Sequence, residues 1–84
     1  MWSKDKIQDV IVGAMPQAKV AVDDLTGTSD HFQVTIVDAS FEGASLIERH
    51  RKIYAILGED VGGAIHALSL KTYTPEQWGK LNQN

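Results

Sequence analysis

Apolar residues near the start of the chain recur at the spacing of a helix with one buried face. Spacings of three and four place them on a single stripe, and the residues concerned are Ile7, Val10, Ile11 and Ala14. Ser3 is a suitable N-cap for this helix, and Trp2 before it can pack on Ile7. Pro16 ends the helix, because proline cannot continue the hydrogen-bonding pattern.

Two segments then show the period of two that is typical of strands. Residues 19–25 carry β-branched side chains at alternate positions, and in residues 31–37 the side chains of Phe32, Val34 and Ile36 share one face. The short segment between these strands consists of Thr, Gly, Ser and Asp. Because this composition forms turns, we expect an antiparallel hairpin.

A second helical pattern follows this hairpin. Its apolar stripe consists of Leu46, Ile47, Ile53, Tyr54 and Leu57. The pattern predicts a helix over about residues 43–57, ended by Gly58. We expect one further helical turn over residues 59–63.

Residues 64–72 again alternate like a strand, and a short helix is predicted directly after them. The Thr74 hydroxyl can accept from the Gln77 amide while the Gln77 side chain reaches back to Thr74, and Pro75 fits the first helical position. Tyr73 and Trp78 flank this cap as a hydrophobic staple.

The order of elements predicts an α+β fold in a single domain. A strand, a helical crossover and another strand usually form a parallel pair, so the last strand should lie parallel to the second. We therefore expect a two-layer sandwich, with a three-stranded mixed sheet and helices on one face. A length of 84 residues suits one modest core.

Composition narrows the candidate functions. A net charge of -3 weighs against nonspecific binding to phosphate backbones. The chain has no cysteine, so any metal bound by this chain alone would rest on histidine or carboxylate. The start turns polar at once, and no apolar run is long enough for a membrane span, so we expect a cytoplasmic protein that does not bind membranes.

Two histidines stand near the starts of predicted parallel strands, His31 and His66. Two imidazoles at the same end of a sheet could approach one metal ion. Strict alternation, however, places His66 on the face of Leu68 and Leu70, whereas His31 points away from Phe32. A histidine hydrogen-bonded within the structure remains the alternative for each.

His50 falls on the predicted buried stripe of the second helix. We expect it to be a core histidine that is bonded to a backbone carbonyl.

The remaining candidate groups have two interpretations each. One set of cations could form a basic patch, although a solvated face is the commoner explanation for such a run; the set comprises Arg49, Arg51, Lys52 and Lys71. Trp78 is either a hydrophobic pin or part of a partner surface.

No catalytic motif is present: the chain lacks a phosphate-binding glycine loop, a nucleophile elbow and a zinc-binding helix. Asp23 and Asp24 are adjacent, and neighbours on a strand point to opposite faces. We therefore predict a protein that is not an enzyme.

Several of these segments together resemble the BolA family. They are residues 41–45, residues 49–54 with Leu57, residues 65–71, and residues 74–78, in the family's order. The resemblance runs from the first helix to Trp78, so it implies a single BolA-like domain over residues 1–84. It also implies the family's fold, α-β-β-α-(α)-β-α, which is related to the type II KH domain, with residues 59–63 as the short third helix.

The resemblance implies an adapter in iron–sulfur cluster trafficking or iron-dependent regulation. BolA-like proteins pair with monothiol glutaredoxins and share a [2Fe-2S] cluster, for which the glutaredoxin and glutathione supply the thiolates. Imidazole can replace thiolate on one iron, as in Rieske centres. His66 matches the family's histidine ligand and its partner contact, and His31 occupies the place of the second ligand. The isolated chain is expected to bind no cluster.

The family also includes DNA-binding transcriptional regulators, so a KH-like DNA-binding regulator is the alternative. The chain lacks the Gly-x-x-Gly clamp of KH nucleic-acid sites. If DNA is bound, the residues to test are Arg49, Arg51, Lys52 and Lys71. The sequence leaves a homodimer open.

Overall fold

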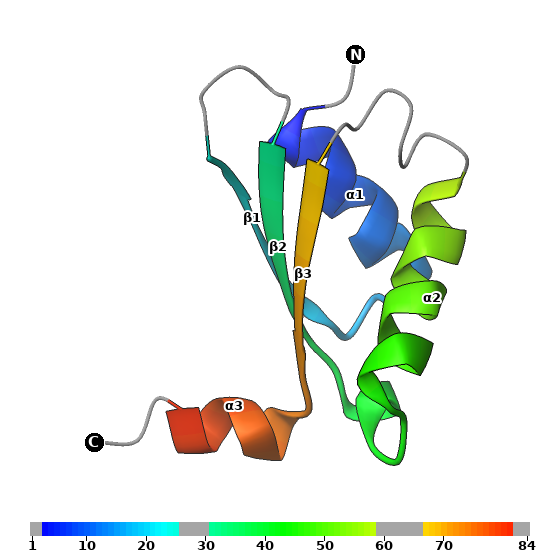
Figure 1. The fold of residues 1–84 in the computed structure, drawn as a ribbon, viewed down its shortest axis with the longest axis vertical. Coiled ribbons are helices and arrows are strands. Elements are labelled where there is room, and N and C mark those ends of the chain that lie inside the picture. Colours follow the sequence, from blue (N-terminus) through cyan, green and yellow to red (C-terminus); the bar gives the residue numbers. More distant parts are fainter. Residues whose placement is uncertain (1–2, 26–30, 59–66, 82–84) are drawn as a thin grey trace.

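The structure, a computed structural model, describes residues 3–25, 31–58 and 67–81. Figure 1 shows how the elements are arranged in space. In chain order they are α1 (Lys4–Ala14), β1 (Lys19–Asp24), β2 (His31–Val37), the short 3-10 helix η1 (Ala39–Phe41), α2 (Leu46–Leu57), β3 (Ala67–Tyr73) and α3 (Pro75–Leu81).

The three strands form one mixed sheet in the order β1-β2-β3. β1 and β2 are antiparallel, with Lys19 opposite Val37 and Asp24 opposite Phe32. β2 and β3 are parallel, and His31 is paired with Ala67. The predicted hairpin, parallel pair and α+β class are therefore confirmed.

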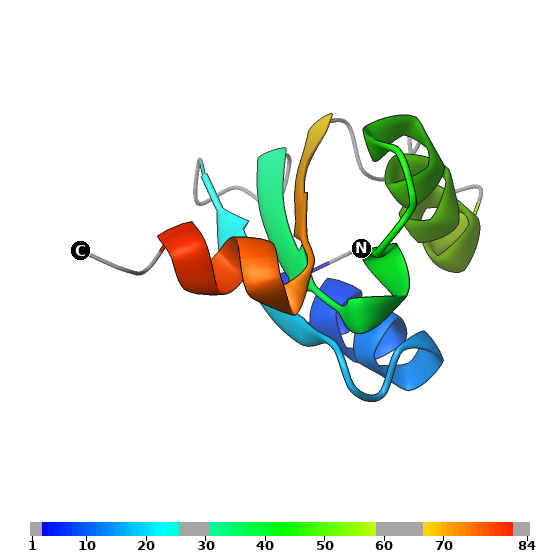
Figure 2. The same ribbon diagram turned by 90° about the horizontal axis from the view of Figure 1, so that it is seen from below.

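Two helices cover one face of this sheet, as Figures 1 and 2 show for α1 and α2. The core between the layers is apolar because alternate strand residues meet the buried stripes of these helices. Its buried residues are Ile7, Ile11, Met15, Phe32, Val34, Ile36, Phe41, Ile53 and Leu57.

The third helix lies elsewhere, at the end of the sheet where β3 stops (Figure 1). Trp78 of α3 lines a hollow with Ala21, Thr35 and Val37, which point away from the core face. Val37 is 6% exposed although it faces away from α1 and α2. The prediction that helices lie on one face is therefore correct for α1 and α2, whereas α3 contributes to the opposite face.

Helix α1 begins as its sequence predicts. The Ser3 side chain accepts from the Lys6 amide, so the N-cap is confirmed. Ile7 and Ile11 are fully buried, whereas Ala14 is exposed. Trp2, the predicted staple residue, lies outside the described residues.

Helix α2 begins at Leu46, three positions later than expected. Gly43 has a φ of +78°, which no right-handed helix contains. Ser45 and Glu48 then form a capping box: the Ser45 hydroxyl accepts from the Glu48 amide, and the Glu48 carboxylate accepts from the Ser45 amide. Gly58, with a φ of +79°, ends the helix as predicted.

The predicted apolar stripe of α2 is partly wrong. Leu46 and Ile47 are 63% and 64% exposed, and Arg49 is buried together with Ile53 and Leu57. The buried stripe of α2 therefore runs through Arg49, Ile53 and Leu57, and Leu46 and Ile47 lie outside it. The predicted turn over residues 59–63 and the first part of the predicted third strand lie outside the described residues.

In the described ranges, which omit residues 26–30 and 59–66 and both ends, no helix combines the length and hydrophobicity that crossing a membrane requires.

Candidate functional site

The first candidate site is the end of the sheet where β2 and β3 begin. His31 is exposed, and its neighbour Phe32 is 1% exposed on the opposite face. The His31 carbonyl accepts from the Leu25 amide at 2.9 Å, so the hairpin ladder fixes the backbone of this histidine. The prediction that His31 points away from the Phe32 face is confirmed, and its ring is open to a partner.

The second predicted ligand, His66, lies outside the described residues. Its covalent neighbour Ala67 begins β3 and is the register partner of His31. The predicted meeting of the two strand starts at one end of the sheet is confirmed for His31 and Ala67. The predicted side-chain direction of His66 stays a prediction.

Within the described part of the chain, no group of three or more His, Cys, Asp or Glu side chains is placed to hold a metal ion. At the end of the sheet where β2 begins, the described residues supply one imidazole, that of His31. A metal centre here therefore needs further donors, and these must include thiolates from another molecule if the centre is an iron–sulfur cluster.

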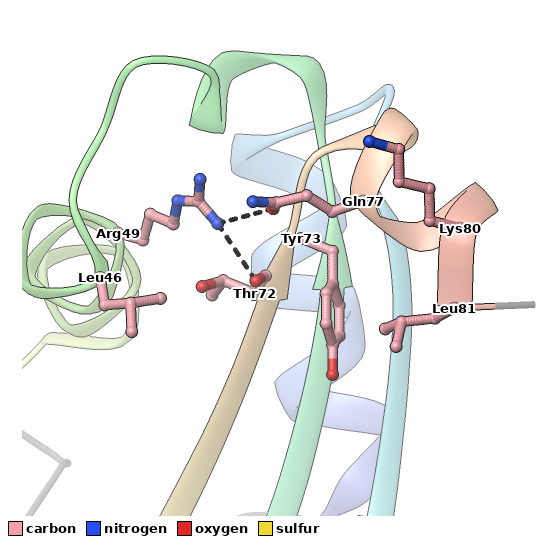
Figure 3. Close-up of a pocket in the computed structure, with 7 residues that line it drawn as sticks. All are labelled: Leu46, Arg49, Thr72, Tyr73, Gln77, Lys80 and Leu81. Atoms are coloured by element: carbon pink, nitrogen blue, oxygen red, sulfur yellow. Dashed lines mark hydrogen bonds between the residues drawn. The ribbon is translucent and has the colours of Figure 1, made fainter.

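The opposite end of the β2–β3 pair is held by Arg49 (Figure 3), which is 7% exposed. Its Nη1 donates to the Thr72 carbonyl at 3.2 Å and to the Gln77 Oε1 at 3.1 Å, and its Nε donates to the Ala44 carbonyl at 3.1 Å. The guanidinium also lies over the Phe41 ring, 5.6 Å from its centroid. One side chain thus connects α2, β3 and α3.

The predicted cap of α3 is confirmed at this end. The Thr74 amide donates to the Gln77 Oε1 at 2.9 Å, and the Gln77 amide donates to the Thr74 Oγ1 at 3.1 Å. The rings of Tyr73 and Trp78 have centroids 5.4 Å apart, as the staple predicts. Trp78 is half-buried, and its role in a partner surface stays a prediction.

A groove of about 440 Å³ lies beside this cap, between α2 and α3 (Figure 3). Thr72 and Tyr73 form its floor, and Leu46 and Leu81 stand on opposite sides of it, 63% and 58% exposed. The Thr72 Oγ1 is buried without a hydrogen-bond partner among the described residues. An apolar group with an adjoining polar atom would match this surface.

The four basic candidates do not form one patch. Arg49 is buried, so the interpretation as a solvated residue is wrong for it, because backbone carbonyls and Gln77 satisfy its donors. Arg51 and Lys52 are exposed on α2, and the Lys52 Nζ donates to the Ser40 Oγ at 3.1 Å. Lys71 is exposed on the sheet face that points away from α2.

His50 differs from the sequence-based expectation. It is half-buried rather than a core residue, and its ring lies edge-on to that of Tyr54, with centroids 6.4 Å apart. The described residues contain no backbone carbonyl bonded to its side chain. Tyr54 is itself 38% exposed, which places the pair at the margin of the core.

The role of Arg49 as an internal connector differs from both sequence-based interpretations of it. A signal for it is present, because Arg49 stands four residues before Ile53 and eight before Leu57, in phase with the buried stripe. Its acceptors come from β3 and α3, which are distant in sequence.

Comparison with known proteins shows a consistent set of relatives. Residues 12–77 match the family model described as BolA-like protein. "BolA-like protein 1" of Pongo abelii is 46% identical over 57 residues, which is 68% of this chain and 42% of that protein. "DNA-binding transcriptional regulator BolA" of Haemophilus influenzae is 40% identical over 57 residues, or 68% of this chain and 55% of that protein. The chain spans about half the length of these curated relatives.

A solved structure of a BolA protein homologue from Coxiella burnetii has the same fold. It matches with a TM-score of 0.78 and 32% identity, covering 94% of this chain and 99% of that one.

Proposed function

Because this chain belongs to the BolA-like protein family, we propose that it is a non-catalytic adapter that binds a monothiol glutaredoxin and shares a [2Fe-2S] cluster with it. The proposed role lies in iron–sulfur cluster trafficking or in iron-dependent regulation. The main support for the proposal is the exposed side chain of His31. His31 is the register partner of Ala67, the covalent neighbour of His66, at the point where two parallel strands begin.

The donor chemistry of the chain supports this division of labour. In some [2Fe-2S] clusters two imidazole nitrogens bind one iron, and thiolates bind the other iron. Since the chain has no cysteine, the proposed partner and its glutathione supply the thiolates. The cluster is cargo in this scheme, and the part of this chain is to present nitrogen ligands.

The sheet provides the spacing for two such ligands. Adjacent strands lie about 4.8 Å apart, so the two strand starts are neighbours. Alternation places His66 on the face opposite to His31, so binding a common iron ion requires the two rings to meet around the end of the sheet. The hydrogen bond from Leu25 to the His31 carbonyl fixes the backbone from which one ring projects. Orientation of the ligand thus comes from the hairpin.

The test mixes the protein with a cluster-loaded monothiol glutaredoxin that carries glutathione and records visible circular dichroism. We expect the spectrum to change on mixing with the unmodified protein, and the change to be lost with His66→Ala and reduced with His31→Ala. His50→Ala on α2 is the matched control and should behave as the unmodified protein. The absence of any spectral change on mixing would rule out the adapter.

A DNA-binding regulator is the second candidate, because the Haemophilus influenzae relative carries that name. Among the candidate cations, Arg51 and Lys52 are exposed on α2, where they can contact phosphate. Lys71 is exposed on the sheet face that points away from α2. Buried Arg49 would have to leave its acceptors to contribute. A mobility shift on duplex DNA that weakens steeply with salt and with the double change Arg51→Ala, Lys52→Ala would favour this candidate.

A further inference from the structure

The outer edge of β1 exposes backbone hydrogen-bonding groups. In the sheet order β1-β2-β3, no described element pairs with the outer side of β1. The bond from the Leu25 amide to the His31 carbonyl shows which backbone groups face β2, namely those of Leu25 and of every second residue before it. The N–H and C=O groups of Val20 and Val22 therefore point outward.

The other edge of the sheet is partly closed. On β3 the outward carbonyl of Thr72 accepts from Arg49, which covers this end of the edge. No side chain of the described residues plays this role for Val20 or Val22. An exposed strand with unpaired backbone groups is a template for pairing with another chain.

The sequence of β1 is complementary to itself when it is paired about Ala21. Lys19 and Asp23 are both exposed and share the face that points away from α1. A two-fold antiparallel pair centred on Ala21 sets Lys19 opposite Asp23 of the second copy, twice. In the same register Val20 lies opposite Val22 of the second copy, so their outward groups exchange hydrogen bonds at both ends of the pair.

Neighbouring registers lack this complementarity. Centring the pair on Val22 sets Lys19 opposite Leu25, and centring it on Val20 sets Lys19 opposite Ala21. Centring it on Asp23 brings two like charges together, which destabilises a cross-strand pair. Only the register about Ala21 combines two opposite-charge pairs with alignment of Val20 and Val22.

We propose that this chain forms a two-fold symmetric homodimer through β1, in which the two sheets join as β3-β2-β1-β1-β2-β3. His31 lies on β2 and takes no part in the proposed β1 pair, so the dimer does not depend on the proposed adapter function.

The test is the oligomeric state, measured by sedimentation equilibrium over a range of protein concentrations. We expect a reversible dimer. Lys19→Asp alone and Asp23→Lys alone each turn two attractive pairs into two repulsive ones, and should weaken dimerisation about tenfold or more. The double change Lys19→Asp, Asp23→Lys restores opposite charges in the same register and should restore the dimer.

Lys71→Asp is the matched control, since it reverses an exposed charge on β3 and leaves β1 unchanged. A chain that is monomeric at every concentration overturns the proposal. So does a dimer that survives both single reversals, because it would then use another surface.

Discussion

The two ends of the β2–β3 pair differ in how their polar groups are satisfied. Where the strands stop, Arg49, Thr74 and Gln77 bond to one another and to backbone groups, and the Asp38 amide donates to the Tyr73 carbonyl at 3.0 Å. Where the strands begin, the His31 side chain is exposed. Apart from the Thr72 Oγ1, the polar side chains named at the first end are bonded within the chain, whereas the second end exposes an imidazole.

This difference separates residues that stabilise the fold from His31, the proposed ligand. Buried polar groups are costly unless they are bonded, so a change at the Arg49 end should act on the free energy of unfolding. An exposed side chain contributes little to that free energy. Changes at the His31 end should therefore act on binding while stability is preserved.

The largest expected effect is that of Arg49→Ala. It leaves the carbonyls of Ala44 and Thr72 without their donor, and should lower the free energy of unfolding in urea by about 3 kcal/mol. Arg51→Ala, two residues away and exposed, is the control and should change it by less than about 0.5 kcal/mol. Equal effects of the two changes would contradict the assignment of Arg49 as an internal connector.

Thr74→Ala should have an intermediate effect. Loss of the hydroxyl that accepts from the Gln77 amide should cost about 1 kcal/mol in the same urea titration. Thr74→Ser keeps the hydroxyl and should retain most of the stability. Similar losses in both variants would assign the effect to the methyl group rather than to the cap.

His31→Ala should change the free energy of unfolding by less than about 0.5 kcal/mol, because the ring is exposed. The same variant should alter the spectrum of the glutaredoxin mixture described above. A large loss of stability would instead make His31 a structural residue, and would remove the contrast between the two ends.

The smallest expected effect is a pH dependence at the start of α2. The Ser45 backbone amide, and then its hydroxyl, hold the pKa of Glu48 below its ordinary value of 4.5. A lowered folded-state pKa stabilises the protein above the ordinary value, and this stabilisation is lost as the pH falls through the folded-state pKa. Glu48→Gln should therefore lower stability at pH 7, with the difference from the unmodified protein shrinking at pH 3, measured by urea unfolding at both values.

The sequence was most informative where local chemistry decides the structure. The bounds of β2 and the reciprocal Thr74–Gln77 cap follow from alternation and from side-chain-to-backbone bonds within four residues. The parallel pairing of β2 with β3 follows from the helical crossover between them. The family and its fold were equally accessible, since the motifs extend over most of the chain.

The sequence was least informative where distant segments decide the structure. The burial of Arg49 depends on acceptors from β3 and α3, which no local period reveals. Leu46 and Ile47 were expected in the core because they are apolar, yet they are exposed. The start of α2 was misplaced because the positive φ of Gly43 and the capping box at Ser45 outweigh the helical pattern before them.

The central strand β2 joins one neighbour through a short hairpin and the other across the whole of α2. Closing the longer connection costs more chain entropy, so in refolding β1 and β2 should associate early and β3 should dock late. The His31–Ala67 register is therefore among the last parts of the sheet to be assembled. A refolding chain would acquire the ligand site proposed at these strand starts in the same step that completes its native state.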